Sequence, residues 1–244
     1  MDSLLLNGLS RRIFSLLPIW LRCFFQSLAF FGVLRVGKSS YIHPSVHVLG
    51  KSNIQIGHNS CISEGVWLNV NHRVSKKISI YIGSNCFIGK SNFFSCGDEI
   101  FISDFVLTAI GCKFIGSTHI FNDPATPYMA TGTTCNDRIV VGLNCFFGAG
   151  TTVMGNISIG RGSIIGANSF VLENVPPFSI VIGNPAKVVK RYSFIKKMWL
   201  PVTLLSDCDE RAMPSEQDYL DILKLNYPVV NMPWIAAGKS MGDL

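Results

Sequence analysis

The stretch VGLNCFFGAGTTVMGNISIGRGSIIGANSFVLENV, residues 141–175, decides the fold. An apolar residue recurs there at every sixth position, and these lead residues are Val141, Phe147, Val153, Ile159, Ile165 and Val171. An α-helix repeats every 3.6 residues and a strand every two, so six is the period of neither. Glycine or another small residue often follows the lead residue, and each glycine would destabilise a helix by up to about 1 kcal/mol. The pattern therefore indicates a hexapeptide repeat.

The same spacing extends over residues 41–184 with a few interruptions. The earlier lead residues are Ile42, Val48, Ile56, Ile62, Leu68, Ile82, Ile88, Phe94, Ile102, Thr108 and Phe114. Two interruptions are long enough to be loop insertions, at residues 69–79 and 116–138. A fixed short period of this kind is typical of a solenoid, and a period of six indicates a parallel β-helix. We expect a triangular coil in which each hexad forms one side and each lead residue points to the axis.

Residues 1–40 are apolar and aromatic with interspersed arginines. They lack the features of a cleavable signal peptide. Pro18, Arg22 and Gln26 would fall inside any membrane span, which argues against a transmembrane helix. We expect an N-terminal helical segment. It either lies at a membrane surface through residues 1–34, or packs on its own domain or on another subunit.

Residues 185–244 are expected to form an extension beyond the coil. The segment PSEQDYLDILKL, residues 214–225, predicts a short helix capped by Ser215, with Asp218 three residues on. The last residues of the chain have no clear periodicity.

Composition and charge narrow the function classes. The chain of 244 residues is 48% hydrophobic and 15% charged, which excludes a disordered protein. The net charge is +6, and the basic residues concentrate in 11–35 and 187–197. This modest excess of positive charge suits a phosphate-bearing ligand or an anionic membrane face. The sequence contains no nucleic-acid-binding motif.

The eight cysteines form no CxxC pair, so neither a zinc site nor a thioredoxin-like motif is indicated. Cys86 and Cys145 both occupy the fifth place of a hexad, where we expect small apolar fillers. Free thiols are consistent with a reducing cytoplasm.

The segment IGANSFVLENVPPFSIVIGNPAKVVKRY, residues 165–192, with the repeats before it, resembles the hexapeptide-repeat acyltransferases. The resemblance covers roughly residues 42–192. It is closest to the galactoside, maltose and streptogramin acetyltransferase branch, which includes bacterial polysaccharide O-acetyltransferases. It implies an all-β fold, a left-handed parallel β-helix. It also implies a homotrimer with active sites between neighbouring chains and acetyl-CoA as the acyl donor.

In that family a histidine in the loop that interrupts the coil is catalytic, and by position it is His119, in GSTHIFNDP. Acetyl transfer to a hydroxyl needs a base for its proton, a task suited to neutral imidazole. Asp123 either orients this imidazole or begins the NDP turn. In the first insertion Asn71 and His72 face the acceptor, or else His72 is a solvated loop residue. The remaining histidines, 43, 47 and 58, are expected in surface or inter-turn roles.

The resemblance also implies the acetyl-CoA site. The pantetheine arm would meet backbone groups at Ala149 and Ala167, and the CoA phosphates would meet Lys187 and Lys190, assisted by Arg191. The alternatives are packing of two small corner residues and a solvated basic tail.

Two positions depart from the family pattern. Relatives often carry Thr-Lys where this chain has Leu172-Glu173, so an anionic group replaces a cationic contact near the 3′-phosphate. Phe146 stands where many relatives have tryptophan.

The sequence thus predicts an acetyl-CoA-dependent O-acetyltransferase acting on a saccharide in the biosynthesis of surface polysaccharide (capsule, O-antigen or exopolysaccharide). His119 would act as base, and backbone N–H groups near Phe147–Ala149 would stabilise the oxyanion. No metal is expected. The predicted location is cytoplasmic, peripheral on the inner face of the membrane if residues 1–34 bind it. The alternatives are N-acetylation of a nucleotide-linked amino sugar and a non-catalytic or metal-binding solenoid.

Overall fold

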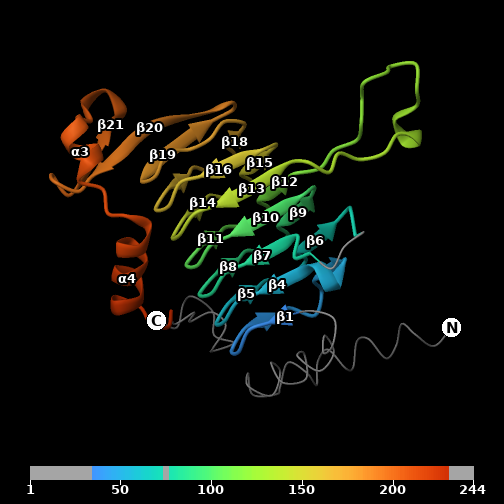
Figure 1. Ribbon diagram of the computed structural model, residues 1–244, viewed down its shortest axis with the longest axis horizontal. Helices are drawn as coiled ribbons and strands as arrows, with labels where there is room; N and C mark the ends of the chain where they lie inside the picture. Colours follow the sequence, from blue (N-terminus) through green and yellow to red (C-terminus); the bar gives the residue numbers. More distant parts are fainter. Residues whose placement is uncertain (1–34, 74–76, 231–244) are drawn as a thin grey trace.

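The computed structural model describes residues 35–73 and 77–230. The chain winds into a left-handed coil with three flat sides, each a parallel sheet, so that every third strand is a neighbour in space (Figure 1). We call the sides face A, face B and face C in the order in which the chain meets them. The predicted β-helix is confirmed.

Faces A and C contain six strands each. The strands of face A are β1 (Arg35–Val36), β4 (Ile54–Ile56), β7 (Ile80–Ile82), β10 (Glu99–Ile102), β13 (Arg138–Val141) and β16 (Ile157–Ile159). Those of face C are β3 (His47–Leu49), β6 (Trp67–Val70), β9 (Phe93–Cys96), β12 (Lys113–Ile115), β15 (Thr152–Met154) and β18 (Phe170–Val171). Because β1 already belongs to the coil, the coil begins at least six residues before the predicted start at residue 41.

Face B is longer because the chain returns on it. Its parallel strands are β2 (Tyr41–Ile42), β5 (Cys61–Ile62), β8 (Phe87–Ile88), β11 (Leu107–Thr108), β14 (Phe146–Phe147), β17 (Ile164–Ile165) and β19 (Ser179–Gly183). The antiparallel strands β20 (Ala186–Ser193) and β21 (Met198–Pro201) extend the same sheet. Residues 186–201 were expected to leave the coil, and they instead add two strands to its last turn.

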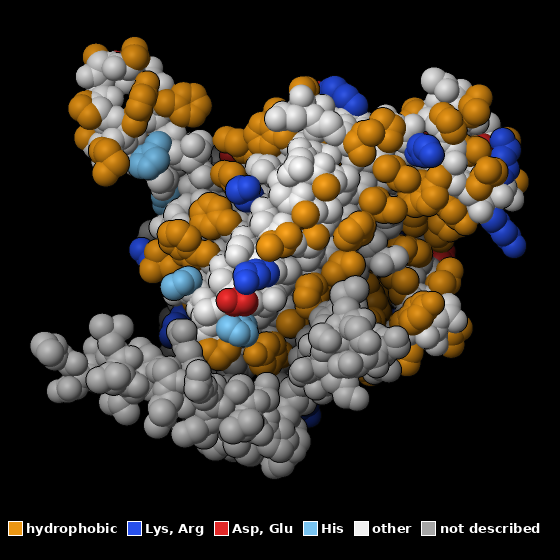
Figure 2. Space-filling view, turned by 180° about the vertical axis from the view of Figure 1, so that it is seen from behind, with side chains coloured by type: hydrophobic (Ala, Val, Ile, Leu, Met, Phe, Trp, Pro, Cys, Tyr) orange, Lys and Arg blue, Asp and Glu red, His pale blue; other side chains and the backbone are white. Residues whose placement is uncertain are grey.

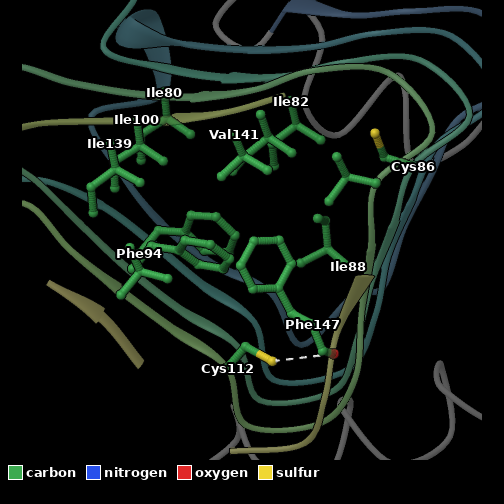
Figure 3. Packing of buried hydrophobic residues seen from close by; sticks show 14 of the residues in the cluster. Ile80, Ile82, Cys86, Ile88, Phe94, Ile100, Cys112, Ile139, Val141 and Phe147 are labelled. Carbon is green, nitrogen blue, oxygen red and sulfur yellow. Dashed lines mark hydrogen bonds between the residues drawn. The ribbon is translucent and has the colours of Figure 1, made fainter. Parts of the chain in front are cut away.

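The core lies along the axis of the coil (Figure 3). The predicted lead residues point into it, and nearly all of them are fully buried. Phe94, Phe114 and Phe147 come from successive turns and pack on one another, with ring centroids 4.8 and 5.2 Å apart. The one polar lead residue, Thr108, accepts a hydrogen bond from the Gly89 N–H at 2.9 Å, so its burial is compensated. The hexad pattern therefore predicted the burial of the lead residues, while the core also contains other residues such as Ile54, Ile80 and Ile139.

The cysteines at the fifth hexad position fill the coil as predicted. Cys86 and Cys145 are buried, and desolvation raises the pKa of each thiol to about 12. Both thiols are therefore protonated at neutral pH and are poor nucleophiles.

We name each corner after the faces it joins. Two long insertions leave the coil at the CA corner, two turns apart (Figure 1). The first insertion comprises residues 71–79, since β6 continues to Val70. The second comprises residues 116–137, since β13 begins at Arg138, and it includes the short 3₁₀ helix η2 (Tyr128–Ala130). We call this second insertion the arm, because it projects beyond the coil. A further 3₁₀ turn, η1 (Lys51–Asn53), lies at the CA corner of the first turn.

The C-terminal extension continues through η3 (Val202–Leu204), α3 (Asp207–Arg211) and α4 (Glu216–Asn226). The predicted cap of α4 is present, since the Asp218 N–H donates to Ser215 Oγ at 3.1 Å. A second small core forms where Leu223 packs with Phe105 and Leu143 of the coil. No helix within the described ranges is long and apolar enough to cross a membrane. The predicted membrane-surface segment, residues 1–34, lies outside them.

Candidate active site

His119 lies near the base of the arm, on one strand of a short antiparallel stem. Its backbone pairs with Thr133, and the next rung is the Ile120 N–H donating to Gly132 O at 2.9 Å. One step closer to the coil, Ser117 Oγ donates to the Thr134 carbonyl at 2.7 Å. The imidazole itself is exposed. An exposed imidazole on a paired stem is accessible to a bound hydroxyl and can serve as its base.

Asp123 lies at the first bend of the arm beyond the stem. Its carboxylate accepts from the Ala125 N–H and from Thr126 Oγ1, both at 2.9 Å. These two bonds lower the pKa of Asp123. They form the turn that the NDP sequence suggested, and the structure shows no hydrogen bond from Asp123 to His119. The orienting role of Asp123 stays a prediction.

Asn71 and His72 begin the first insertion and are half-buried. Asn71 Nδ2 donates to Ser95 Oγ at 3.0 Å, and His72 Nε2 lies 3.1 Å from Thr133 Oγ1. The structure thus brings His72 against the stem that carries His119. Thr133 was not singled out in the sequence, because nothing in a pattern links residues 61 positions apart.

Ala149 and Ala167 occupy the middle of the BC corner in two successive turns. The corners stack, since the Asn168 N–H donates to Ala149 O at 2.8 Å. The Gly148 N–H is used within the coil, where it donates to Ile165 O at 2.7 Å. Within the described residues, the N–H groups of Ala149 and Ala167 donate to no protein acceptor. Two unpaired N–H groups beside small side chains can serve a ligand that lies along the corner.

The three predicted phosphate contacts lie on β20 but differ in availability. Lys190 is exposed. Lys187 is exposed too, but its Nζ pairs with Glu173 Oε1 at 2.8 Å. The departure noted in the sequence therefore acts directly on a predicted CoA contact.

Arg191 is turned toward the extension. Its side chain is only 11% exposed, pairs with Glu210 of α3 and donates to the Pro177 carbonyl at 3.3 Å. These contacts fasten α3 to the coil, so Arg191 is the least available of the three.

Within one chain the predicted residues fall into two groups. His119, Asn71 and His72 gather at the CA corner, whereas Ala149 and Ala167 lie across face C at the BC corner. The structure shows no contact between the groups. Over the described part of the chain, no three His, Cys, Asp or Glu side chains gather in a way that could hold a metal ion.

The comparisons with known proteins agree with the fold. The family Bacterial transferase hexapeptide (six repeats) matches residues 138–173. Curated protein sequences give no significant match.

Several solved structures share the coil. AntD, an N-acyltransferase from Bacillus cereus, superimposes with a TM-score of 0.57 as a variant bound to dTDP and coenzyme A, at 24% identity over 68% of this chain and 88% of that chain. AntD with dTDP and 3-hydroxybutyryl-CoA gives 0.57 at 23% identity over 68% and 87%. A maltose O-acetyltransferase from Clostridium difficile 630 gives 0.47 at 20% identity over 68% and 74%. The chain therefore contains hexapeptide repeats over residues 138–173 and shares the left-handed β-helix fold with AntD.

Proposed function

We propose that the protein is an acyl-CoA-dependent O-acetyltransferase that modifies a sugar hydroxyl in surface-polysaccharide biosynthesis. The observation that carries the proposal is His119, an exposed imidazole on a braced stem that leaves a hexapeptide coil. The unpaired N–H groups of Ala149 and Ala167 support it, because they fit an acyl-CoA lying along the BC corner.

The chemistry needs few groups from the protein. His119 accepts the proton of the acceptor hydroxyl as its oxygen attacks the thioester carbonyl carbon. Within the predicted Phe147–Ala149 group, we assign the oxyanion to the Ala149 N–H, because it donates to no protein acceptor whereas the Gly148 N–H does. When the tetrahedral intermediate collapses, the C–S bond breaks and the imidazolium returns its proton to the CoA sulfur. The products are the acetyl ester and free CoA.

A homotrimer would unite the two groups of residues, because the arm of one copy could reach the BC corner of the next. Exposed apolar side chains on faces B and C support such contacts, including Trp67, Leu107 and Phe146, which are 47%, 38% and 39% exposed. Figure 2 shows hydrophobic side chains in rows along the outside of the coil. At the arm, Phe121 and Met129 are 66% and 91% exposed, which suits burial against a neighbouring copy.

A second candidate is N-acylation of a nucleotide-linked amino sugar. AntD, which has the same coil, is an N-acyltransferase whose structures contain dTDP and coenzyme A. Such an enzyme is expected to carry a nucleotide-recognising segment ahead of the coil, and the sequence of residues 1–40 does not look like one. A cytoplasmic location at the inner membrane face remains part of the proposal.

The test is release of CoA from acetyl-CoA with a panel of sugar alcohols, oligosaccharides and nucleotide-linked amino sugars as acceptors. With the best acceptor, His119→Ala should lower kcat by about two to four orders of magnitude. His119→Asn should do no better, because an amide cannot accept the proton. A matched control is His47→Ala, which removes another exposed histidine, on β3 of face C. Near-parent turnover by a folded His119→Ala would show that the base lies elsewhere, and an amine preference would favour the second candidate.

A further inference from the structure

The two insertions at the CA corner touch each other. His72 Nε2 of the first insertion lies 3.1 Å from Thr133 Oγ1 of the arm, in a partly buried contact. Thr133 is the residue whose backbone pairs with His119. The imidazole of His72 therefore contacts the residue that pairs with the proposed base, His119, in the stem.

A second polar connection reaches the other strand of the stem. Asn71 Nδ2 donates to Ser95 Oγ at 3.0 Å, and Ser95 Oγ donates to the Ser117 carbonyl at 3.3 Å. Ser117 lies two residues before His119. The first insertion thus contacts both strands of the stem, one directly and one through Ser95.

The root of the arm is fastened by charged groups from the same corner. Lys77 Nζ of the first insertion pairs with Asp98 at 2.6 Å, and Arg138 pairs with Glu99 at 2.5 Å and with Asp98 at 3.8 Å. These pairs are largely exposed, so each stabilises only weakly. Together they tie the end of the first insertion to the end of the arm.

The arm needs such support. A lone two-stranded hairpin is marginally stable in water, and the arm projects beyond the coil (Figure 1). A general base must hold within hydrogen-bond reach of its proton, and a displacement of about 1 Å can cost about a hundredfold in rate. A stem held only at its root would leave the imidazole of His119 free to swing.

We propose that His72 is a positioning residue that acts on His119 through Thr133. The catalytic consequence rests on the proposed function, but the contact between the insertions does not. This role differs from a contact between His72 and the acceptor. A positioning residue changes kcat, whereas an acceptor contact that is equal in ground and transition states changes KM.

Four single variants and one double variant test the proposal kinetically. His72→Ala and Thr133→Val should each lower kcat about 5- to 20-fold, with the KM values for acceptor and acyl-CoA within about twofold of the parent. His72→Gln and Thr133→Ser should recover most of the rate, because each restores a group able to hydrogen-bond. The double variant His72→Ala/Thr133→Val should lose no more than either single variant, because both remove one interaction. Additive losses, or a rise of about tenfold in the acceptor KM alone, would overturn the proposal.

Hydrogen exchange tests the contact without relying on activity. In His72→Ala the N–H groups of Ile120 and Thr134, which close the stem, should exchange about tenfold faster, while those of Gly142 and Gly148 in the coil should not change. Unchanged exchange in the stem would show that His72 does not hold it. If stem exchange rises while the parent transfers no acyl group to any acceptor, the contact is confirmed and the proposed function is wrong.

Discussion

The AB corner and the BC corner are built from the same hexad, yet they differ in the hydrogen bonding of the backbone N–H of their middle residues. In the first three turns of the AB corner the middle N–H is taken by a side chain of the next turn: the Lys38 N–H donates to His58 Nδ1 at 2.9 Å, the His58 N–H to Ser84 Oγ at 3.1 Å, and the Ser84 N–H to Asp104 Oδ1 at 2.7 Å. At the BC corner Ala149 and Ala167 offer no such acceptor to each other, and their N–H groups stay unpaired.

The C-terminal extension covers the AB corner as well. Asn144 Nδ2 donates to the Tyr219 hydroxyl at 2.6 Å, and Asn59 Nδ2 donates to the Val230 carbonyl at 3.1 Å. The comparison teaches that the repeat fixes the backbone, while side chains of the first turns and the C-terminal extension close the AB corner and leave the BC corner open to a ligand. The three predictions that follow test this, from the largest expected effect to the smallest.

Stacking of the turns should matter equally at both corners. A Cβ at Gly148 would lie 2.5 Å from the backbone nitrogen of Ala167, and one at Gly142 would lie 2.6 Å from that of Arg161. We expect Gly148→Ala and Gly142→Ala each to destabilise the fold by about 3 kcal/mol, because the next turn must shift. Gly111→Ala is the control, since its Cβ meets nothing within 4 Å and only its φ of +72° is unfavourable, at about 1–2 kcal/mol.

Urea unfolding of the three variants measures these differences. If Gly111→Ala costs as much as Gly148→Ala, the penalty comes from backbone conformation and not from contact between turns. If Gly142→Ala is tolerated and Gly148→Ala is not, the two corners differ in stacking, and the comparison drawn above is wrong.

The role of the unpaired N–H groups at the BC corner can be tested by removing one of them. Proline occurs naturally at the middle position of an AB corner, as Pro177, where the following Phe178 N–H donates to Arg161 O at 2.8 Å. Ala149→Pro should therefore fold with a melting temperature close to that of the parent. Loss of one hydrogen bond should weaken acyl-CoA binding about 2- to 10-fold, and kcat should fall in addition if the same N–H meets the oxyanion.

The control for the donor prediction is Ala149→Ser, which keeps the N–H and adds a small side chain. Isothermal titration with CoA separates binding from chemistry. An unchanged CoA affinity in a folded Ala149→Pro protein would mean that the unpaired N–H groups of the BC corner serve solvent only.

The sequence predicted the coil well and the contacts between its loops poorly. Lead residues such as Ile88 and Phe114 follow a period, so their burial could be read from spacing alone. The hairpin β20–β21 has no period of six, and it was expected outside the coil. The contact of His72 with Thr133 depends on two loops leaving the same corner, a property of the wound chain that no local pattern encodes. Arg191 was grouped with the exposed lysines because burial against α3 cannot be seen in a basic segment.

The smallest predicted effect concerns Glu173, beyond the open corner. Its carboxylate holds Lys187 in an ion pair whose side chains are 72% and 61% exposed, so the pair should add little to stability. If Lys187 meets a CoA phosphate, the carboxylate competes for the same ammonium group, and Glu173→Gln should lower the KM for acyl-CoA about 2- to 3-fold. The gain should vanish in a Lys187→Ala background and fade in high salt, because exposed charges are screened. Glu64→Gln is the matched control, since it frees Lys90 from a similar exposed pair, with the atoms 3.0 Å apart, in an earlier turn of the BC corner. Equal effects of the two substitutions would indicate a general change in surface charge, and no effect of either would leave Lys190 as the sole phosphate contact on β20.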